Sequence, residues 1–146
     1  MYSLFINNVH GSLLYHRNFS PKVQLSSNEE IRVASTFHGL SAIASRLSPV
    51  LSHENSQLSF LEPTGINSIE ADNFRLICYE TLTGLKFYLV AETQVTNLEY
   101  YLKKVYEAFS DYVLKNPFYD IDMPIRCELF DKAIEKLFYD STPVIK

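Results

Sequence analysis

The chain has 146 residues, the size of one domain and enough to bury a core. Hydrophobic residues make up 47% and charged residues 21%, and the net charge is −4, which is typical of an ordinary soluble globular protein. No cluster of Lys and Arg marks a nucleic-acid-binding face, and no apolar run approaches the roughly 18 residues that span a bilayer. Composition therefore argues against a nucleic-acid partner and against direct membrane insertion.

The first elements along the chain are two short strands and a helix. Tyr2, Leu4 and Ile6 alternate with Ser3, Phe5 and Asn7 in a period-two pattern. His10-Gly11 breaks the pattern and residues 13–15 resume it, which predicts an N-terminal hairpin. Ser26 and Glu29, and equally Ser27 and Glu30, have the spacing of a capping box that opens a helix ending before Pro49. The predicted buried stripe of that helix consists of Val33, Phe37, Leu40, Ala44 and Leu47, and a second apolar set consists of Ala34, Ala42 and Ile43.

A three-stranded meander follows. Residues 51–64 are polar and irregular, the pattern of a mobile loop, and strand-like runs then cover residues 66–70, 74–79 and 86–91, with turn residues between them. Thr96 and Glu99 form another capping box, before a helix with a stripe at Val95, Leu98, Leu102, Val105, Phe109 and Tyr112. A last helix of about three turns follows a proline-rich connection, and residues 141–146 are expected to be a frayed tail.

This order of elements predicts an α+β fold. Its only helix-length crossover follows the second strand, so an all-parallel doubly wound sheet is excluded. We expect a five-stranded, mostly antiparallel sheet with one helix on one face and two on the other, in a single domain over residues 1–140.

Residues 115–131 form the most informative segment, with two prolines, three aromatic residues and no glycine. A residue before proline is disfavoured in a helix, so the long helix must stop near Asn116 and the next should start around Pro124. We call residues 116–126 the elbow. A stiff, aromatic elbow between two amphipathic helices suits a docking surface, and its candidate interface residues are Asn116, Pro117, Phe118, Tyr119, Asp120, Met123, Pro124 and Arg126.

Several elbow residues have two interpretations. Phe118 and Tyr119 either fold back as a lid on the core or contact a partner, and the ten Phe and ten Tyr of the whole chain pose the same choice. Asp120 and Asp122 are either solvated loop charges or contacts to basic groups of a partner. Arg126, at the expected start of the last helix, is neutralised within the chain or pairs with an external carboxylate.

No catalytic, cofactor or metal site is expected. The four histidines contain no pair with ligand spacing, and His38 should instead donate a hydrogen bond where the first long helix meets the sheet. Cys78 and Cys127 match no metal or redox spacing, so we expect reduced, buried thiols. The first residues lack the charged opening and cleavage site of a signal peptide. The second apolar side of the first helix is expected to serve an interface, because exposed apolar patches usually mark partners.

Three blocks carry a family resemblance: residues 27–49, residues 74–87 and, most specifically, residues 115–131. In these blocks the chain resembles the synbindin-like, longin-type subunit of the TRAPP vesicle-tethering complex, and the element order is similar to the longin, or profilin-like, fold. Several such subunits carry a PDZ-like insert between the second strand and the first helix. The few residues between Asn18 and Ser27 leave no room for it, which keeps the other longin-type TRAPP subunit as an alternative identity.

The resemblance implies a non-catalytic scaffold in endoplasmic-reticulum-to-Golgi transport, in the cytoplasm and peripherally on early Golgi or endoplasmic reticulum membranes through its complex. The implied partners are the second longin-type subunit, a palmitoylated subunit of a different fold, and a Rab GTPase whose nucleotide exchange the complex promotes. An alternative is a freestanding longin regulatory domain of another trafficking protein, which would need a following heptad-patterned segment and an anchor. A small hydrolase is disfavoured because no nucleophile or phosphate-loop motif is present.

Overall fold

The computed structural model describes residues 3–22, 24–47 and 66–139. The elements follow the predicted order, and they are β1 (Ser3–Asn7), β2 (Leu13–Asn18), α1 (Ser27–Leu47), β3 (Ser68–Glu70), β4 (Arg75–Glu80), β5 (Lys86–Ala91), α2 (Leu98–Ala108), the π-helical turn η3 (Phe109–Val113) and α3 (Glu128–Tyr139). The expected loop at residues 51–64 and the expected tail at residues 141–146 lie outside the described residues.

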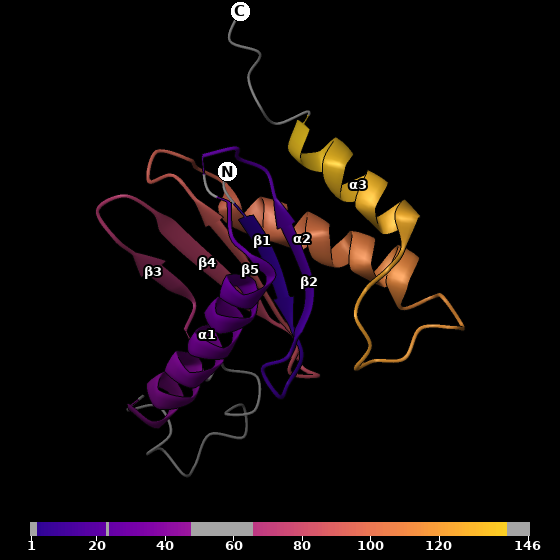
Figure 1. Cartoon of the computed structure of the whole chain (residues 1–146), viewed down its shortest axis with the longest axis horizontal. Helices are drawn as coiled ribbons and strands as arrows, with labels where there is room; N and C mark the ends of the chain where they lie inside the picture. The colour runs from indigo at the N-terminus through magenta and orange to yellow at the C-terminus, as the bar shows by residue number, and fades with distance from the viewer. Residues whose placement is uncertain (1–2, 23, 48–65, 140–146) are drawn as a thin grey trace, which may run out of the picture.

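The five strands form one sheet in the order β2-β1-β5-β4-β3. All four neighbouring pairs are antiparallel, so the predicted sheet is confirmed. The first strand of the chain lies inside the sheet between β2 and β5 (Figure 1). Both edges of β1 are therefore paired with other strands, and all five of its residues are buried.

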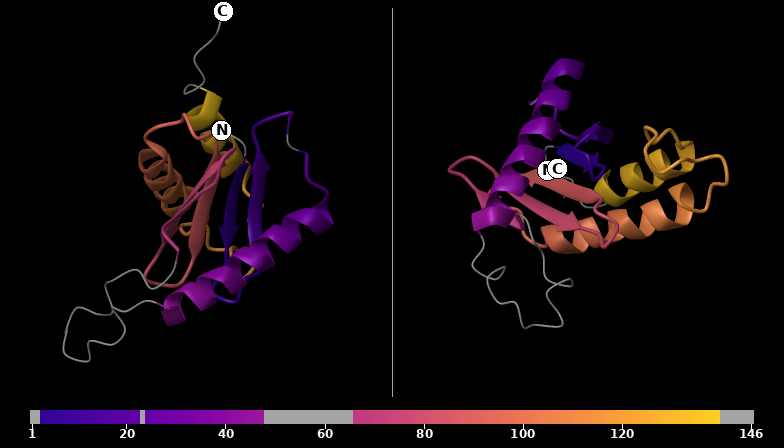
Figure 2. Two further views of the ribbon diagram at one scale, coloured as in Figure 1. Left: turned by 90° about the vertical axis from the view of Figure 1, so that its left-hand side faces the viewer. Right: turned by 90° about the horizontal axis from the view of Figure 1, so that it is seen from below.

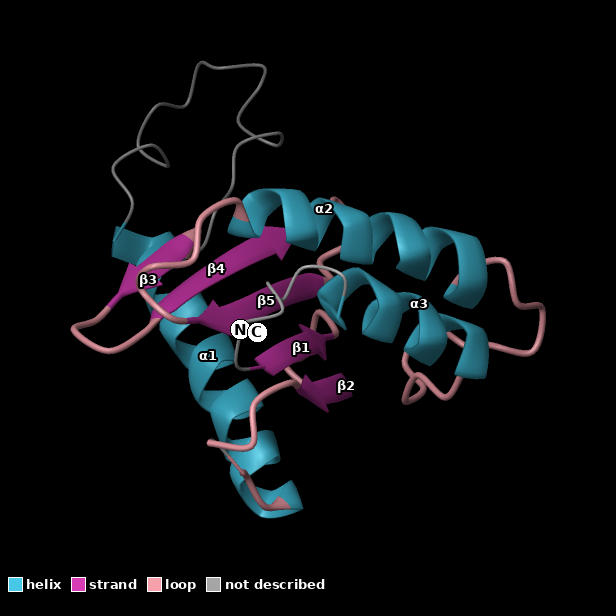
Figure 3. Cartoon of the chain, turned by 90° about the horizontal axis from the view of Figure 1, so that it is seen from above, coloured by secondary structure: helices cyan, strands magenta, loops and turns pink. Residues whose placement is uncertain are grey.

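The helices cover the two faces of the sheet as predicted. α1 lies across one face, and α2 and α3 run side by side on the other (Figures 2 and 3). The smaller core, beneath α1, contains Phe5, Phe37, Leu76 and Tyr88. The larger core lies between the sheet and the α2–α3 pair, where Phe109 and Phe130 are fully buried. Most of the hydrophobic stabilisation therefore comes from the α2–α3 face.

One of the two possible capping boxes starts α1. The Ser26 amide donates to Glu29 Oε2 at 2.8 Å, and the Glu29 amide donates to Ser26 Oγ at 3.4 Å. The predicted buried stripe of α1 was partly wrong, because Ala34, Phe37 and Ser41 face the sheet whereas Leu40 and Leu47 are 46% and 77% exposed. α1 carries apolar residues on two sides, and spacing alone does not tell which side meets the sheet.

His38 does not make the hydrogen bond predicted for it. Its buried Nδ1 atom has no hydrogen-bond partner among the described residues. The ring instead lies against Gly11 in the β1–β2 turn, where an added Cβ atom would come within 2.5 Å of the His38 side chain. His38 is thus a packing residue at the contact between α1 and this turn.

The predicted capping box of α2 was wrong. Asn97 is the N-cap, with a left-handed backbone (φ 63°) and no side-chain cap bond. Such a box needs an extended cap residue, and Asn tolerates the left-handed region better than most residues do. At the other end, the η3 turn places Val113 in the core and leaves the predicted stripe residue Tyr112 41% exposed.

Candidate protein-partner interface

The elbow follows directly after η3. The Leu114 amide donates to the Phe109 carbonyl across five residues, and the Asn116 amide donates to the Val113 carbonyl, so helical structure ends near Asn116 as predicted. Two tight turns come next. The Tyr119 amide donates to the Asn116 carbonyl at 3.2 Å, and the Met123 amide donates to the Asp120 carbonyl at 3.0 Å.

Side chains within the elbow fix these turns. Asn116 Oδ1 accepts a hydrogen bond from the Phe118 amide at 3.1 Å, and Asp120 Oδ1 accepts one from the Ile121 amide at 2.8 Å. The Tyr119 hydroxyl lies 2.9 Å from the Met123 carbonyl oxygen, to which it donates. The elbow is therefore closed by its own polar groups, which makes it a shaped surface and not a loose loop.

Two long-range bonds attach the elbow to the sheet. The Ile125 amide donates to the Leu14 carbonyl at 2.9 Å, along the outer edge of β2, and the Ile125 side chain is buried. Asn8 Nδ2 donates to Asp122 Oδ1 at 3.3 Å from the β1–β2 turn. The predicted start of the last helix near Pro124 was wrong: residues 124–127 are not helical, the Ile125 amide is bonded to β2 instead, and α3 begins only at Glu128.

The candidate interface residues differ in exposure. Phe118 is 90% exposed, whereas Tyr119 is partly buried and packs against the larger core, so the lid interpretation holds for Tyr119 alone. Asn116 is half-buried and Met123 is 49% exposed. The remaining candidates, all exposed, are Pro117, Asp120, Pro124 and Arg126.

The charged side chains of the elbow are exposed. Asp120 and Asp122 are both exposed and hold elbow and turn groups by hydrogen bonds. Burial, and then the charges of Asp122 and Asp120, raise the pKa of Tyr119, so its hydroxyl stays protonated as a donor. Arg126 precedes α3, and no carboxylate of the described residues lies within 4.0 Å of it. No group of three or more potential metal ligands occurs in the described part of the chain.

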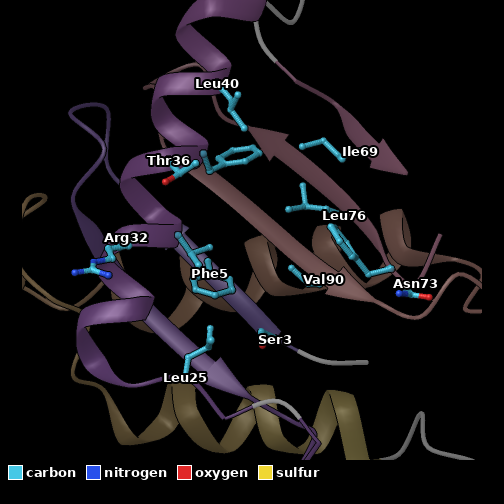
Figure 4. A pocket seen from close by; sticks show the side chains of 13 residues that line it. Ser3, Phe5, Leu25, Arg32, Thr36, Leu40, Ile69, Asn73, Leu76 and Val90 are labelled. Carbon is cyan, nitrogen blue, oxygen red and sulfur yellow. The ribbon is translucent and has the colours of Figure 1, made fainter. Parts of the chain in front are cut away.

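A second apolar feature is a groove of about 730 Å³ between α1 and the sheet (Figure 4). Phe5, Leu76 and Val90 of the sheet and Leu40 of α1 point into it, and Arg32 is its one charged lining residue. Three further apolar residues of α1, exposed by at least half, are Ile31, Ile43 and Leu47. Of the predicted second apolar set, Ala42 and Ile43 are exposed but Ala34 is buried against the sheet, so this prediction was partly wrong. The groove was missed because its floor combines residues from four strands far apart in sequence.

Ile121 was also missed. It is 63% exposed and adds to the apolar surface of the elbow. The signal was a lone apolar residue between two aspartates in a turn, where a polar residue is usual. Among the described helices, none combines the length and the apolar character that a membrane crossing requires.

Comparisons with known proteins identify a family and several similar proteins. The model of the Sybindin-like family matches residues 1–141. Trafficking protein particle complex subunit 4 of Dictyostelium discoideum is 47% identical over 135 residues, which is 92% of this chain and 93% of that protein. The Homo sapiens subunit 4 is 46% identical over 112 residues, which is 77% of this chain.

The chain spans about half the length of the mammalian relatives, 47% of the human protein. Trafficking protein particle complex subunit 1 of Dictyostelium discoideum is more distant, at 27% identity over 133 residues. The family match and the relative that is aligned over nearly its whole length agree with the longin-like sheet and helices. This chain belongs to the Sybindin-like family.

Proposed function

We propose that this chain is a non-catalytic subunit of a TRAPP-type trafficking complex. The observation that carries the proposal is the 47% identity to a trafficking protein particle complex subunit 4 over more than nine-tenths of both chains. Identity at that level over nearly the whole of both chains supports a shared fold and shared subunit contacts. The weaker similarity to a subunit 1 supports the subunit 4 type over the other longin-type subunit.

The complex, in this proposal, tethers vesicles in endoplasmic-reticulum-to-Golgi transport and promotes nucleotide exchange on a Rab GTPase. Such exchange needs no bond chemistry. A surface that binds the nucleotide-free GTPase more tightly than the loaded form shifts the equilibrium towards nucleotide release. An internally bonded elbow with the exposed ring of Phe118, and with an Arg126 that has no ion-pair partner among the described residues, supplies the anchors that this requires.

We assign the candidate interface residues of the elbow to contact with the GTPase. The exposed side of α1 is assigned to a neighbouring subunit, of which the second longin-type subunit is the first candidate and the palmitoylated-type subunit the other. Exposed apolar side chains in such numbers usually mark a protein contact. The chain then reaches early Golgi or endoplasmic reticulum membranes peripherally, from the cytoplasm, through its complex.

The experiment that tests membership is affinity capture of the tagged full-length chain from its own cells, with identification of the bound proteins. The other TRAPP subunits are expected together, in comparable amounts and through a high-salt wash, since subunit interfaces of this kind bury apolar area that salt does not weaken. A capture without any TRAPP subunit would contradict the proposal. In the same experiment the double variant Leu40→Asp with Ile43→Asp, on the exposed side of α1, should fold but capture at least one subunit fewer than the parent chain.

A further inference from the structure

The elbow shares its end of the sheet with two hairpin turns. Asn8, in the β1–β2 turn, holds Asp122 of the elbow at 3.3 Å. The neighbouring residue Val9 touches the β4–β5 turn, because a Cβ atom added at Gly84 would lie 2.8 Å from Val9 Cγ2. Figure 1 shows both turns and the elbow at the same end of the sheet. The three segments, far apart in sequence, form one continuous surface.

This surface carries apolar side chains at the tips of its loops. Leu82, in the β4–β5 turn, is 84% exposed, and Val9 is 51% exposed. They adjoin the elbow, where Phe118 and Ile121 are exposed in the same way. Loop tips ordinarily carry polar residues or glycine, so four exposed apolar tips on one end are unusual.

Leu82 contributes nothing to the turn that presents it. The Thr81 amide donates to the Leu85 carbonyl at 2.9 Å, and the Gly84 amide donates to the Thr81 carbonyl at 3.0 Å. Thr81 Oγ1 also accepts a hydrogen bond from the Leu85 amide at 3.1 Å. Since backbone groups and a threonine close the turn, a polar side chain at position 82 would serve folding equally well.

We propose that the β1–β2 turn and the β4–β5 turn extend the elbow into one docking surface, and that Leu82 is a contact residue for the same folded protein partner. The inference rests on the proposed function, which makes that partner the nucleotide-free GTPase. It adds two segments and one anchor residue that the elbow sequence does not contain.

The shape and the charges of this surface favour a folded protein. An extended peptide needs a groove or a free strand edge, whereas this end presents protruding tips that fit hollows in a preformed surface. A membrane would also accept apolar tips, but Asp120 and Asp122 flank Ile121, and anionic lipid repels carboxylates. Arg126 calls for a carboxylate on the partner, near an apolar hollow.

The test uses the assembled complex containing the full chain, with the Rab GTPase stripped of nucleotide as the probe. Leu82→Ser and Phe118→Ser are each expected to weaken binding by about tenfold or more, the usual loss at an interface anchor. Tyr100→Ser is the matched control. Tyr100 is 56% exposed at the start of α2. Because α2 follows β5, its start lies at the opposite end of the sheet from the β4–β5 turn. Tyr100→Ser should therefore bind within about twofold of the parent.

The outcomes distinguish failure of this inference from failure of the proposed function. Weaker binding by Phe118→Ser with unchanged binding by Leu82→Ser would overturn the extension and leave the proposed function standing. If the complex binds the GTPase and neither variant matters, the elbow loses its role and the extension is lost with it. A complex that does not bind the GTPase at all contradicts both. If the chain instead sediments with phosphatidylserine-containing vesicles and Leu82→Ser abolishes that, the occupant is a lipid surface and the inference is wrong.

Discussion

His16 connects β2 to α1 with one ring nitrogen bonded and the other not. Nδ1 lies 2.9 Å from Glu30 Oε1, and the ring packs against Phe5 at 4.5 Å between centroids. Nε2 is buried and has no hydrogen-bond partner among the described residues. Burial lowers the pKa of His16 more than the neighbouring Glu30 carboxylate raises it. The neutral ring, donating from Nδ1, is therefore the folded form.

Stability should fall as the pH is lowered through the range of His16 titration. The unfolded histidine, with a pKa near about 6.5, binds a proton at a higher pH than the folded one, so the contribution is fully present above that value and is lost below it. Urea unfolding of the parent between pH 8 and pH 5 should show this loss, and His16→Gln should reduce the slope. His10→Gln, at an exposed histidine, is the control, and an identical slope in His16→Gln and the parent would contradict the assignment.

Burial also makes the thiol of Cys78 unreactive. Burial raises its pKa to about 12, so the reactive thiolate is scarce at neutral pH. Cys78 and Cys127 are both free.

At the scale of elements, the contact between α1 and the β1–β2 turn depends on a missing side chain. Gly11 has φ +86°, and an added Cβ would lie 2.5 Å from His38 Cγ, close to the root of that side chain. Gly11→Ala should lower the free energy of unfolding by about 2 kcal/mol or more, because both the backbone strain and the overlap must be relieved. Urea denaturation measures this change.

Gly39 is the matched control on the same helix. It is exposed in α1, and an added Cβ would meet no atom within 4 Å. Gly39→Ala should raise the free energy of unfolding by about 0.5–1 kcal/mol through helix propensity. Equal changes in the free energy of unfolding for the two substitutions would show that the close contact between the β1–β2 turn and α1 does not contribute to stability.

Local patterns predicted the elements well and their ends less well. Period-two runs and the turn at residues 81–84 placed the strands, and the capping box at Ser26 and Glu29 placed the start of α1. The start of α3 was missed because it is set by the Ile125–Leu14 bond, which joins residues 111 apart. Distant contacts of this kind leave no trace in a local pattern.

The candidate interface was predicted in part for the same reason. The elbow's stiffness follows from Pro117 and Pro124, which the sequence displays. The sequence does not show which of the two rings points outward. In the structure Tyr119 turns inward and donates to the Met123 carbonyl, whereas Phe118 is exposed to solvent. Leu82 was overlooked because only the folded sheet brings its turn to the elbow.

At the scale of the molecule, the described residues carry two exposed apolar surfaces. One is the exposed side of α1 with the groove beside it, and the other is the end formed by the elbow and the two turns. Under the proposed function, one surface binds a neighbouring subunit and the other binds the GTPase. α1 lies on one face of the sheet, and α2 and α3, which the elbow follows and precedes, lie on the other (Figure 3).

The most direct measurement is the rate of nucleotide release from the Rab GTPase in the presence of the assembled complex, with Phe118→Ser, Tyr119→Phe and Arg126→Ala combined in this chain. Loss of the exposed ring, the elbow-closing hydroxyl and the unpaired cation should slow release by about tenfold or more while the complex stays intact on size exclusion. An unchanged rate from an intact complex would contradict the account of the elbow as the GTPase-binding surface.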